Sequence, residues 1–313
     1  MTTHPTADSS SPSDLSINDS DVAALHPEIA CIEVSARRHE LLQDGVRVVW
    51  RQFGDHPERP PLVLLHGGHG SWMHWLRNIE ALSAHHTLLL PDLPGYLDSD
   101  TPRDPRPGET SVEPLIEALG GTLDQLVGTG ATIDLGGFSF GGLVGARFAV
   151  RRGNVRKLVL LGSGGHGTMR RLNIEMINWR SAPDRAAEVA ALRHNLAALM
   201  LHDPAAIDDV AFQIHDLACH GTRFRSKGVS TGGGLQAALD VLGNTEQLLI
   251  WGEFDVTADP PRVVEGLLEG HPERRARVIE GAGHWVQYER AEETNDALLG
   301  FLKKENFSNR NRF

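Results

Sequence analysis

Short apolar runs alternate along the chain with longer segments whose apolar residues recur at helical spacing. Glycine, proline or charged residues bound these runs, which is typical of strands buried on both faces of a parallel sheet. The predicted strands are 46–53, 61–65, 87–90, 131–136, 156–161, 246–251 and 275–279. The predicted helices between them are 72–84, 112–127, 143–150 and 291–303. This alternation predicts an α/β protein with a mostly parallel central sheet flanked by helices.

The first predicted strand is expected to have a partner just before it in the chain. Asp44 and Gly45 are a favoured residue pair for a tight turn between two antiparallel strands. We therefore predict that residues 33–39 form a strand that runs antiparallel to residues 46–53.

The pattern changes between residues 166 and 243. Apolar residues recur there at helical spacing in 185–201 and 207–218, and no strand-like run interrupts them. We predict a helical cap, or lid, of residues 166–243, inserted into an α/β core of residues 26–165 and 244–303.

Both ends of the chain are polar. Residues 1–25 are rich in Ser, Thr, Asp and Pro, and we predict a disordered N-terminal tail that is not a secretory signal, because it lacks a basic start and an apolar stretch. Residues 304–313 are predicted to be a polar C-terminal tail.

Composition and charge narrow the range of partners. The chain has 313 residues and a net charge of −11, so we expect neither nucleic acid nor an anionic membrane surface as a partner. No apolar run approaches the roughly 18 residues of a membrane span. The only cysteines, Cys31 and Cys219, lack metal-type spacing and indicate a reducing compartment, so a cytoplasmic location is expected. A small-molecule substrate is the expected partner, and the sequence is compatible with a homo-oligomer.

One short motif carries the chemistry of this sequence. Residues 137–141 read Gly-Phe-Ser-Phe-Gly and lie between a predicted strand and a predicted helix. A Gly-x-Ser-x-Gly in this context is a nucleophile elbow, a tight turn in which glycines avoid clashes between strand and helix. The hydroxyl of Ser139 then stands at the helix N-terminus, where free amides favour a developing oxyanion. We therefore predict that Ser139 is a nucleophile.

Two other residues have the position and the chemistry to activate that serine. Asp255 and His284 each follow a predicted strand, and the carboxyl ends of parallel strands lie at one edge of the sheet. The order Ser139, Asp255, His284 is nucleophile, acid, base. Glu253 or Asp259 could be the true acid instead, with Asp255 acting as a helix cap.

A glycine-rich loop at residues 66–72 follows the strand 61–65 and completes the predicted site. The amides of Gly68 and Phe140 are predicted to form an oxyanion hole, although the loop could be simply a flexible turn. A metal site built from the loop's histidines is disfavoured, because no acidic ligand lies close in the sequence. No metal and no cofactor are expected.

These motifs resemble those of the α/β-hydrolase superfamily over residues 46–303. The resemblance rests on Leu-His-Gly-Gly at 65–68, the elbow at 137–141, Trp-Gly-Glu-Phe-Asp at 251–255 and Gly-His-Trp at 283–285. Within the superfamily the chain is most similar to the meta-cleavage-product hydrolases, which split vinylogous 1,5-diketones made in aromatic ring degradation. That likeness lies in residues 72–79, 160–167 and 283–289. It implies the α/β-hydrolase fold with an inserted helical cap and a cofactor-independent Ser-His-Asp reaction.

The chain departs from that family at positions where polar groups hold the substrate. Two asparagines of the family, one in the early helix and one beside the nucleophile, are replaced here by His74 and Phe138. A cap arginine of the family aligns loosely with His215. We predict that His74, Phe138 and His215 contact the substrate and that Trp285 forms a wall of the pocket.

The departures favour esters over diketones as substrates. The expected function is a serine hydrolase that cleaves carboxylic esters or related carbonyl compounds through an acyl-enzyme. C–C bond hydrolysis is the close alternative, because Arg223 and Arg225 of the predicted cap could replace the lost charge. A non-catalytic binding protein that keeps the three residues, and a cofactor-independent oxygenase on the same scaffold, are rival hypotheses from other classes.

Overall fold

The computed structural model describes residues 24–102, 111–172, 174–243 and 245–303. The predicted tails, 1–25 and 304–313, lie outside the described residues except for residues 24 and 25. Among the described residues, no helix is long and apolar enough to cross a membrane.

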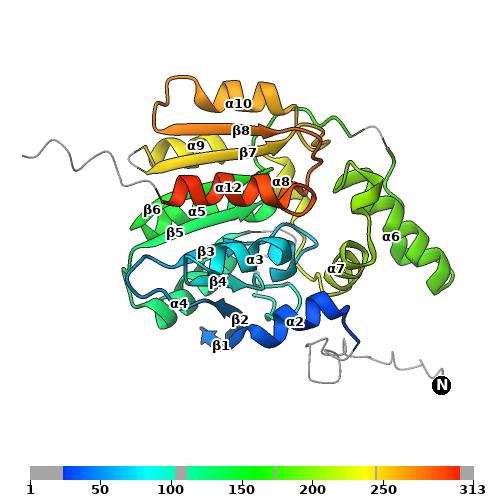
Figure 1. Ribbon diagram of the computed structural model, residues 1–313, viewed down its shortest axis with the longest axis horizontal. Helices are drawn as coiled ribbons and strands as arrows, with labels where there is room; N and C mark the ends of the chain where they lie inside the picture. The colour runs from blue at the N-terminus through cyan, green and yellow to red at the C-terminus, as the bar shows by residue number, and fades with distance from the viewer. Residues whose placement is uncertain (1–23, 103–110, 173, 244, 304–313) are drawn as a thin grey trace, which may run out of the picture.

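The core is one eight-stranded sheet in the order β1-β2-β4-β3-β5-β6-β7-β8 (Figure 1). β2 runs antiparallel to β1 and β4, and all other neighbours are parallel, so the prediction of a mostly parallel sheet is confirmed. The strands are β1 Arg37–Gln43, β2 Val46–Phe53, β3 Leu62–Leu65, β4 Leu88–Pro91, β5 Ile133–Phe138, β6 Val155–Leu161, β7 Glu246–Gly252 and β8 Arg274–Ile279.

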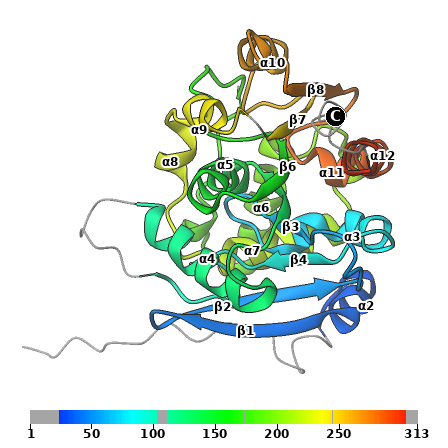
Figure 2. The ribbon, with the colours of Figure 1, turned by 90° about the vertical axis from the view of Figure 1, so that its left-hand side faces the viewer.

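Helices cover both faces of this sheet (Figure 2). Side chains of a strand alternate between its two faces, and β3 shows the result: Leu62 and Leu64 join one hydrophobic cluster, while Val63 and Leu65 join the other. The first cluster includes side chains from α2 Pro27–Ser35, α3 Leu76–Ser83, α11 Val286–Glu289 and α12 Ala291–Leu302. The second includes α4 Glu113–Val127, α5 Phe140–Arg152, α9 Leu235–Val241 and α10 Pro260–Leu268. Continuous burial on both faces explains why the central strands read as unbroken apolar runs.

The predicted strand at 33–39 is wrong in its boundaries. Residues up to Ser35 belong to α2, and the strand β1 pairs with β2 from Arg37 onward through the Asp44-Gly45 turn. Pro27 at the start of α2 has the backbone angle that a first helical turn requires. The helix also brings the carboxylate of Glu33 within 2.6 Å of the buried guanidinium of Arg51. This contact joins α2 to β2, which are not adjacent in the sequence.

The chain between β6 and β7 contains inserted helices. α6 Arg185–Leu199 and α7 Asp209–His220 stand beyond the ends of the strands (Figure 1), whereas α9 packs on α5 within the core. The short elements of this insertion are η2 Trp179–Ser181, η3 Pro204–Ala206 and α8 Lys227–Thr231. The boundaries 166–243 for a cap remain a prediction.

Candidate active site

Ser139 lies in a sharp turn between β5 and α5. Its backbone has φ 54° and ψ −116°, and residues other than glycine rarely adopt such a positive φ. A Cβ atom at Gly137 would lie 2.8 Å from the carbonyl carbon of Gly141, and one at Gly141 would lie 2.7 Å from the carbonyl oxygen of Leu65. Both distances are too short for a side chain, so glycine allows strand, turn and helix to approach this closely. The turn holds the Ser139 hydroxyl at the start of α5.

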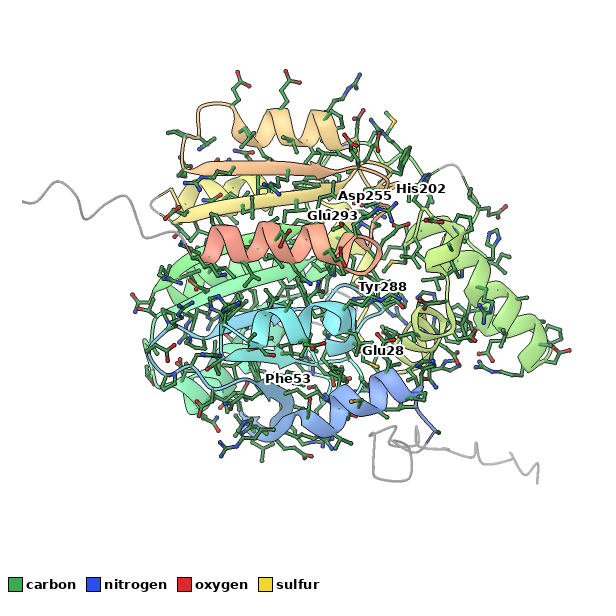
Figure 3. All side chains as sticks on the ribbon, viewed as in Figure 1. Glu28, Phe53, His202, Asp255, Tyr288 and Glu293 are labelled. Atoms are coloured by element: carbon green, nitrogen blue, oxygen red, sulfur yellow. The ribbon has the colours of Figure 1, made fainter. Side chains whose placement is uncertain are left out.

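Ser139, His284 and Asp255 form one hydrogen-bonded chain. The Nε2 atom of His284 lies 2.9 Å from the Oγ atom of Ser139, and its Nδ1 atom lies 2.8 Å from Oδ2 of Asp255. Asp255 follows β7 at the end of the sheet that faces the inserted helices (Figure 3). Ser139 lies more than a hundred positions before the other two residues in the sequence, and the three meet because parallel strands end at a common edge.

The carboxylate of Asp255 is fully buried and held on both oxygens. Its Oδ1 atom accepts hydrogen bonds from the Thr257 amide at 2.8 Å and from the Thr257 hydroxyl at 2.7 Å. Burial by itself would raise the pKa of Asp255, but the positive charge of His284 and the hydrogen bonds from His284 and Thr257 outweigh it. The pKa therefore lies below its ordinary value, and the carboxylate stays ionised to orient the imidazole.

The two alternative acids make other contacts. Glu253 is exposed and accepts a hydrogen bond from the amide of Gly281 at 3.0 Å. Asp259 pairs with Arg171 and Arg262 just before α10. Neither carboxylate contacts His284 among the described residues, so the geometry favours Asp255 as its partner.

The loop after β3 places Gly68 in the wall of the same pocket as Ser139. A Cβ atom at Gly68 would lie 3.7 Å from the Cβ of Phe140, so the two backbones adjoin beside the elbow. Within the described residues, neither amide donates a hydrogen bond to a protein acceptor. Their assignment as an oxyanion hole remains a prediction.

His66 fixes the course of this loop. Its Nδ1 atom lies 2.8 Å from the carbonyl oxygen of Gly67, and its Nε2 atom accepts a hydrogen bond from the Leu93 amide at 2.9 Å. The second bond requires a bare Nε2, so the ring is neutral with its proton on Nδ1. Burial lowers the pKa of His66 to about 4. The histidine that precedes Gly67 is therefore a structural anchor.

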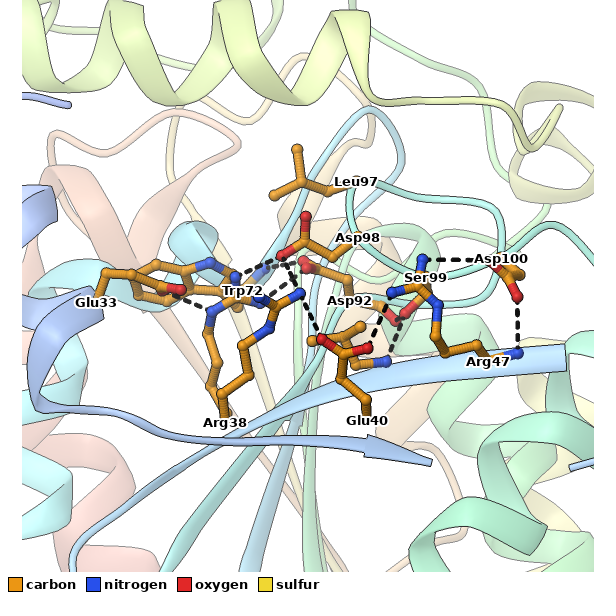
Figure 4. Close-up of polar contacts among 12 residues, drawn as sticks. Glu33, Arg38, Glu40, Arg47, Trp72, Asp92, Leu97, Asp98, Ser99 and Asp100 are labelled. Carbon is orange, nitrogen blue, oxygen red and sulfur yellow. Dashed lines mark hydrogen bonds and ion pairs between the residues drawn. The ribbon is translucent and has the colours of Figure 1, made fainter. Parts of the chain in front are cut away.

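A buried charge cluster supports the other end of the loop (Figure 4). The amide of Trp72 donates to Oδ1 of Asp92 at 3.1 Å, and Arg51 donates to Oδ2 of Asp92 at 2.9 Å. Arg51 also contacts Asp98 at 2.7 Å and Glu33 at 2.6 Å. Burial, together with the neighbouring charge of Asp98, raises the pKa of Asp92 to about 7 although Arg51 opposes the shift. Sequence reasoning missed this cluster, and the signal was a charged Arg51 directly after the apolar run 48–50 of the same strand.

A pocket of about 280 Å³ opens beside Ser139 and His284. Of the predicted substrate-binding residues, Phe138 and His215 line it. Burial lowers the pKa of His215 to about 4, so this ring faces the pocket uncharged. The sequence did not single out Arg170, Lys227 and Thr257, which also line the pocket.

His74 and Trp285 do not line that pocket. Both are buried behind the loop, where the Trp285 indole donates to the His74 carbonyl oxygen at 2.9 Å. The His74 ring accepts a hydrogen bond from the Gly67 amide at 3.2 Å. The helical turn η1 Trp72–Trp75 directs His74 toward the loop backbone, so the two residues predicted to contact the substrate lie outside the lining of this pocket. Among the described residues, no group of three His, Cys, Asp or Glu side chains could hold a metal ion.

Known proteins are similar to this chain in sequence and in fold. The pattern of the family described as "Alpha/beta hydrolase family" matches residues 62–297. The chain is 30% identical over 254 residues to the dihydrolipoyllysine-residue acetyltransferase component of the acetoin cleaving system of Pseudomonas putida, covering 78% of this chain but only 64% of that protein. It is 27% identical over 297 residues to 2-hydroxy-6-oxononadienedioate/2-hydroxy-6-oxononatrienedioate hydrolase 2 of Pseudomonas putida, covering 87% of this chain and 98% of that protein.

The likeness extends to solved structures. An esterase from a Rhodococcus species superimposes with a TM-score of 0.68 at 22% identity, covering 87% of this chain and 100% of that chain. At this identity the likeness shows the fold alone. Because the family pattern spans most of the chain and the sheet has the matching topology, the chain belongs to the alpha/beta hydrolase family.

Proposed function

We propose that the protein is a serine hydrolase that cleaves carboxylic esters or related carbonyl compounds through an acyl-enzyme. The observation that carries the proposal is the hydrogen-bonded chain from Ser139 Oγ through His284 to Asp255, with distances of 2.9 and 2.8 Å. A hydroxyl in a strained turn, a histidine on it and a buried carboxylate behind the histidine are the parts that nucleophilic catalysis requires.

Each residue has a role that follows from its position. Ser139 Oγ attacks the carbonyl carbon while His284 Nε2 takes its proton, and Asp255 stabilises the resulting imidazolium. The amides of Gly68 and Phe140 hold the oxyanion of the tetrahedral intermediate. His284 then delivers the proton to the departing alkoxide, which leaves as an alcohol. Water, deprotonated by His284, releases the acid from the acyl-enzyme and restores Ser139.

The pocket supports ester cleavage over C–C cleavage. Breaking a C–C bond in a dienol diketone requires donors that hold an enolate beside the serine. Phe138 offers no hydrogen bond there, and a neutral His215 offers one donor where an arginine would offer a charged fork. C–C hydrolysis remains the second candidate, because a relative of nearly equal length bears the name of such an enzyme and Arg170 supplies a cation in the pocket.

A fluorophosphonate probe tests the proposal, because such probes bond covalently to an activated serine. We expect one labelled serine in the native protein, and no labelling after Ser139→Ala. The matched control is Ser181→Ala in the exposed turn η2, which should label like the parent. Persistent labelling of Ser139→Ala, or no labelling of a folded parent protein, would instead support the non-catalytic binding hypothesis.

A further inference from the structure

A second hollow continues from the pocket beside Ser139. This groove, of about 750 Å³, is lined by residues of the segment 222–231 together with His69 and Arg180. It shares His69, Ser226 and Lys227 with the pocket that holds Ser139. Because the two hollows have walls in common, one extended molecule could occupy both, with its carbonyl at Ser139 and another part in the groove.

The groove is strongly cationic. Arg180, Arg223, Arg225 and Lys227 line it, and its described lining contains no carboxylate. The whole chain has a net charge of −11, so this concentration of positive charge runs against the average of the molecule. A concave surface lined by one sign of charge focuses its field and attracts a counter-charged ligand.

Acidic residues begin only on the far side of Arg180. A neighbouring hollow shares Arg180 and Thr222 with the groove and contains Asp184 and Glu188. Burial, and then the positive charge of Arg180, lower the pKa of His69 at the boundary between groove and pocket. Among the described linings, carboxylates therefore occur in that neighbouring hollow and not in the groove or the pocket that contains Ser139.

Two cations of the groove are held ready without being neutralised. The side chains of Arg225 and Lys227 form no hydrogen bond or ion pair with any of the described residues. The guanidinium of Arg223 is fixed by the carbonyl oxygens of Leu97 and Ser99, which orient the charge but do not cancel it. An arginine elsewhere in the inserted segment behaves differently, since Arg185 pairs with Asp216.

The cationic character continues into the pocket itself. Arg170 lines the pocket, is only partly exposed, and has no hydrogen-bond or ion-pair partner among the described residues. Burial lowers the pKa of this guanidinium, although the negative charge of Asp255 opposes the shift. No Asp or Glu belongs to the described lining of the pocket. A negatively charged ligand would thus meet cations and no carboxylate along the described lining between the groove and Ser139.

We propose that the groove formed by Arg180, Arg223, Arg225 and Lys227 is an anion subsite, and that the substrate carries a carboxylate or phosphate group that binds there. This inference rests on the proposed hydrolase function, to which it adds the substrate class. The substrate is an anionic ester or related carbonyl compound whose charged end lies in the groove while its carbonyl reaches Ser139.

Three esters test the subsite. 4-Nitrophenyl butyrate is neutral, 5-butyryloxy-2-nitrobenzoate carries a carboxylate on the leaving group, and 4-nitrophenyl hydrogen glutarate carries one on the acyl group. We expect kcat/KM of at least one anionic ester, divided by that of the neutral ester, to fall tenfold or more in the double variant Arg225→Gln/Lys227→Gln. The same ratio should fall with added salt in the parent protein, because salt screens the groove. The matched control is Arg277→Gln, an exposed arginine on β8, which should leave the ratio unchanged.

Direct binding separates failure of the subsite from failure of the hydrolase proposal. Isothermal titration with inorganic phosphate and with citrate distinguishes a phosphate ligand from a carboxylate ligand and requires no turnover. We expect at least one of them to bind the full chain with a Kd that weakens tenfold or more in the double variant. Ester turnover with an unchanged ratio and no binding heat would overturn the subsite alone. Absence of ester turnover and probe labelling, with variant-sensitive anion binding, would overturn the hydrolase and retain the subsite.

Discussion

The sheet edge that holds Ser139, Asp255 and His284 and the inserted segment that lines the pocket are built in opposite ways. At the edge, backbone packs against backbone, and a Cβ atom at Gly252 would lie 2.8 Å from the carbonyl carbon of Ala282. In the inserted segment, a Cβ atom at Gly228 would meet nothing within 4 Å. The edge cannot shift without breaking several strands, whereas the insertion presents side chains over open space. One scaffold can therefore keep a fixed reaction centre while the pocket around it varies.

The largest effect is expected on kcat, when substitutions of two carboxylates near the sheet edge are compared. Asp255→Asn should lower kcat by about three to four orders of magnitude, because an asparagine favours the wrong histidine tautomer. Asp259→Asn is the matched control, since Asp259 pairs with Arg171 and Arg262 and not with His284. Ester turnover by both variants is the measurement. A greater loss in Asp259→Asn would show that Asp259, and not Asp255, is the acid.

Two glycine substitutions test directly whether the sheet edge is more tightly constrained than the inserted segment, because their effects on the free energy of unfolding should differ. Gly141→Ala should lower the free energy of unfolding by about 3 kcal/mol or more, because the new Cβ overlaps the backbone at Leu65 and His66. Gly228→Ala, in α8 of the inserted segment, should change it by less than about 0.5 kcal/mol. Urea unfolding of both variants measures the difference. Similar losses in the two would mean that the sheet edge and the insertion are equally constrained.

The loop after β3 should make the sheet edge sensitive to acid. The folded pKa of His66, about 4, lies below the roughly 6.5 of an unfolded histidine, so the unfolded state binds more protons between these values. Its contribution to stability is then present near pH 7 and is lost as the pH falls toward 4, by roughly 2 kcal/mol between pH 7 and 5.

Unfolding of parent and His66→Gln at several pH values isolates this contribution. Asp92, whose raised pKa gives the opposite slope, is common to both proteins and cancels in the difference. The difference in the free energy of unfolding between parent and variant should therefore shrink by roughly 2 kcal/mol as the pH falls from 7 to 5. An identical slope in the two proteins would show that His66 is not held neutral.

The smallest effect concerns the inserted segment, where substrate choice is decided. Both test substrates should carry a carboxylate, so that the anion subsite favours neither. We expect kcat/KM for 4-nitrophenyl hydrogen glutarate to exceed that for a 2-hydroxy-6-oxo-dienoate by tenfold, about 1.4 kcal/mol in barrier. His215→Arg should narrow the ratio by supplying a charged fork in the pocket. A tenfold preference of the parent for the dienoate would favour the C–C reaction.

The sequence by itself predicted the sheet and the three residues that the structure joins in one hydrogen-bonded chain. Buried strands such as 61–65 are unbroken apolar runs because helices cover both faces, and that signal is local. The elbow motif is equally local as a sequence signal. Gly137 is required by contacts within a few residues, and Gly141 by contacts with Leu65 and His66 at the end of the neighbouring strand β3. The order of Ser139, Asp255 and His284 then followed from strand ends alone. At 33–39 the sequence analysis predicted a strand, but residues up to Ser35 belong to the helix α2. Glu33 of this helix pairs with Arg51 on β2.

Only the tertiary structure decided what surrounds the reaction centre. His74 and Trp285 turned out to support a loop, because their direction depends on how a short helical turn packs and not on their spacing. The pairing of Asp92 with Arg51, and the joining of Arg180 to the segment 222–231 in one cationic groove, bring together residues that no local pattern connects. Charge is read from composition as a sum, −11 here, while its effect depends on distances that only the folded chain sets.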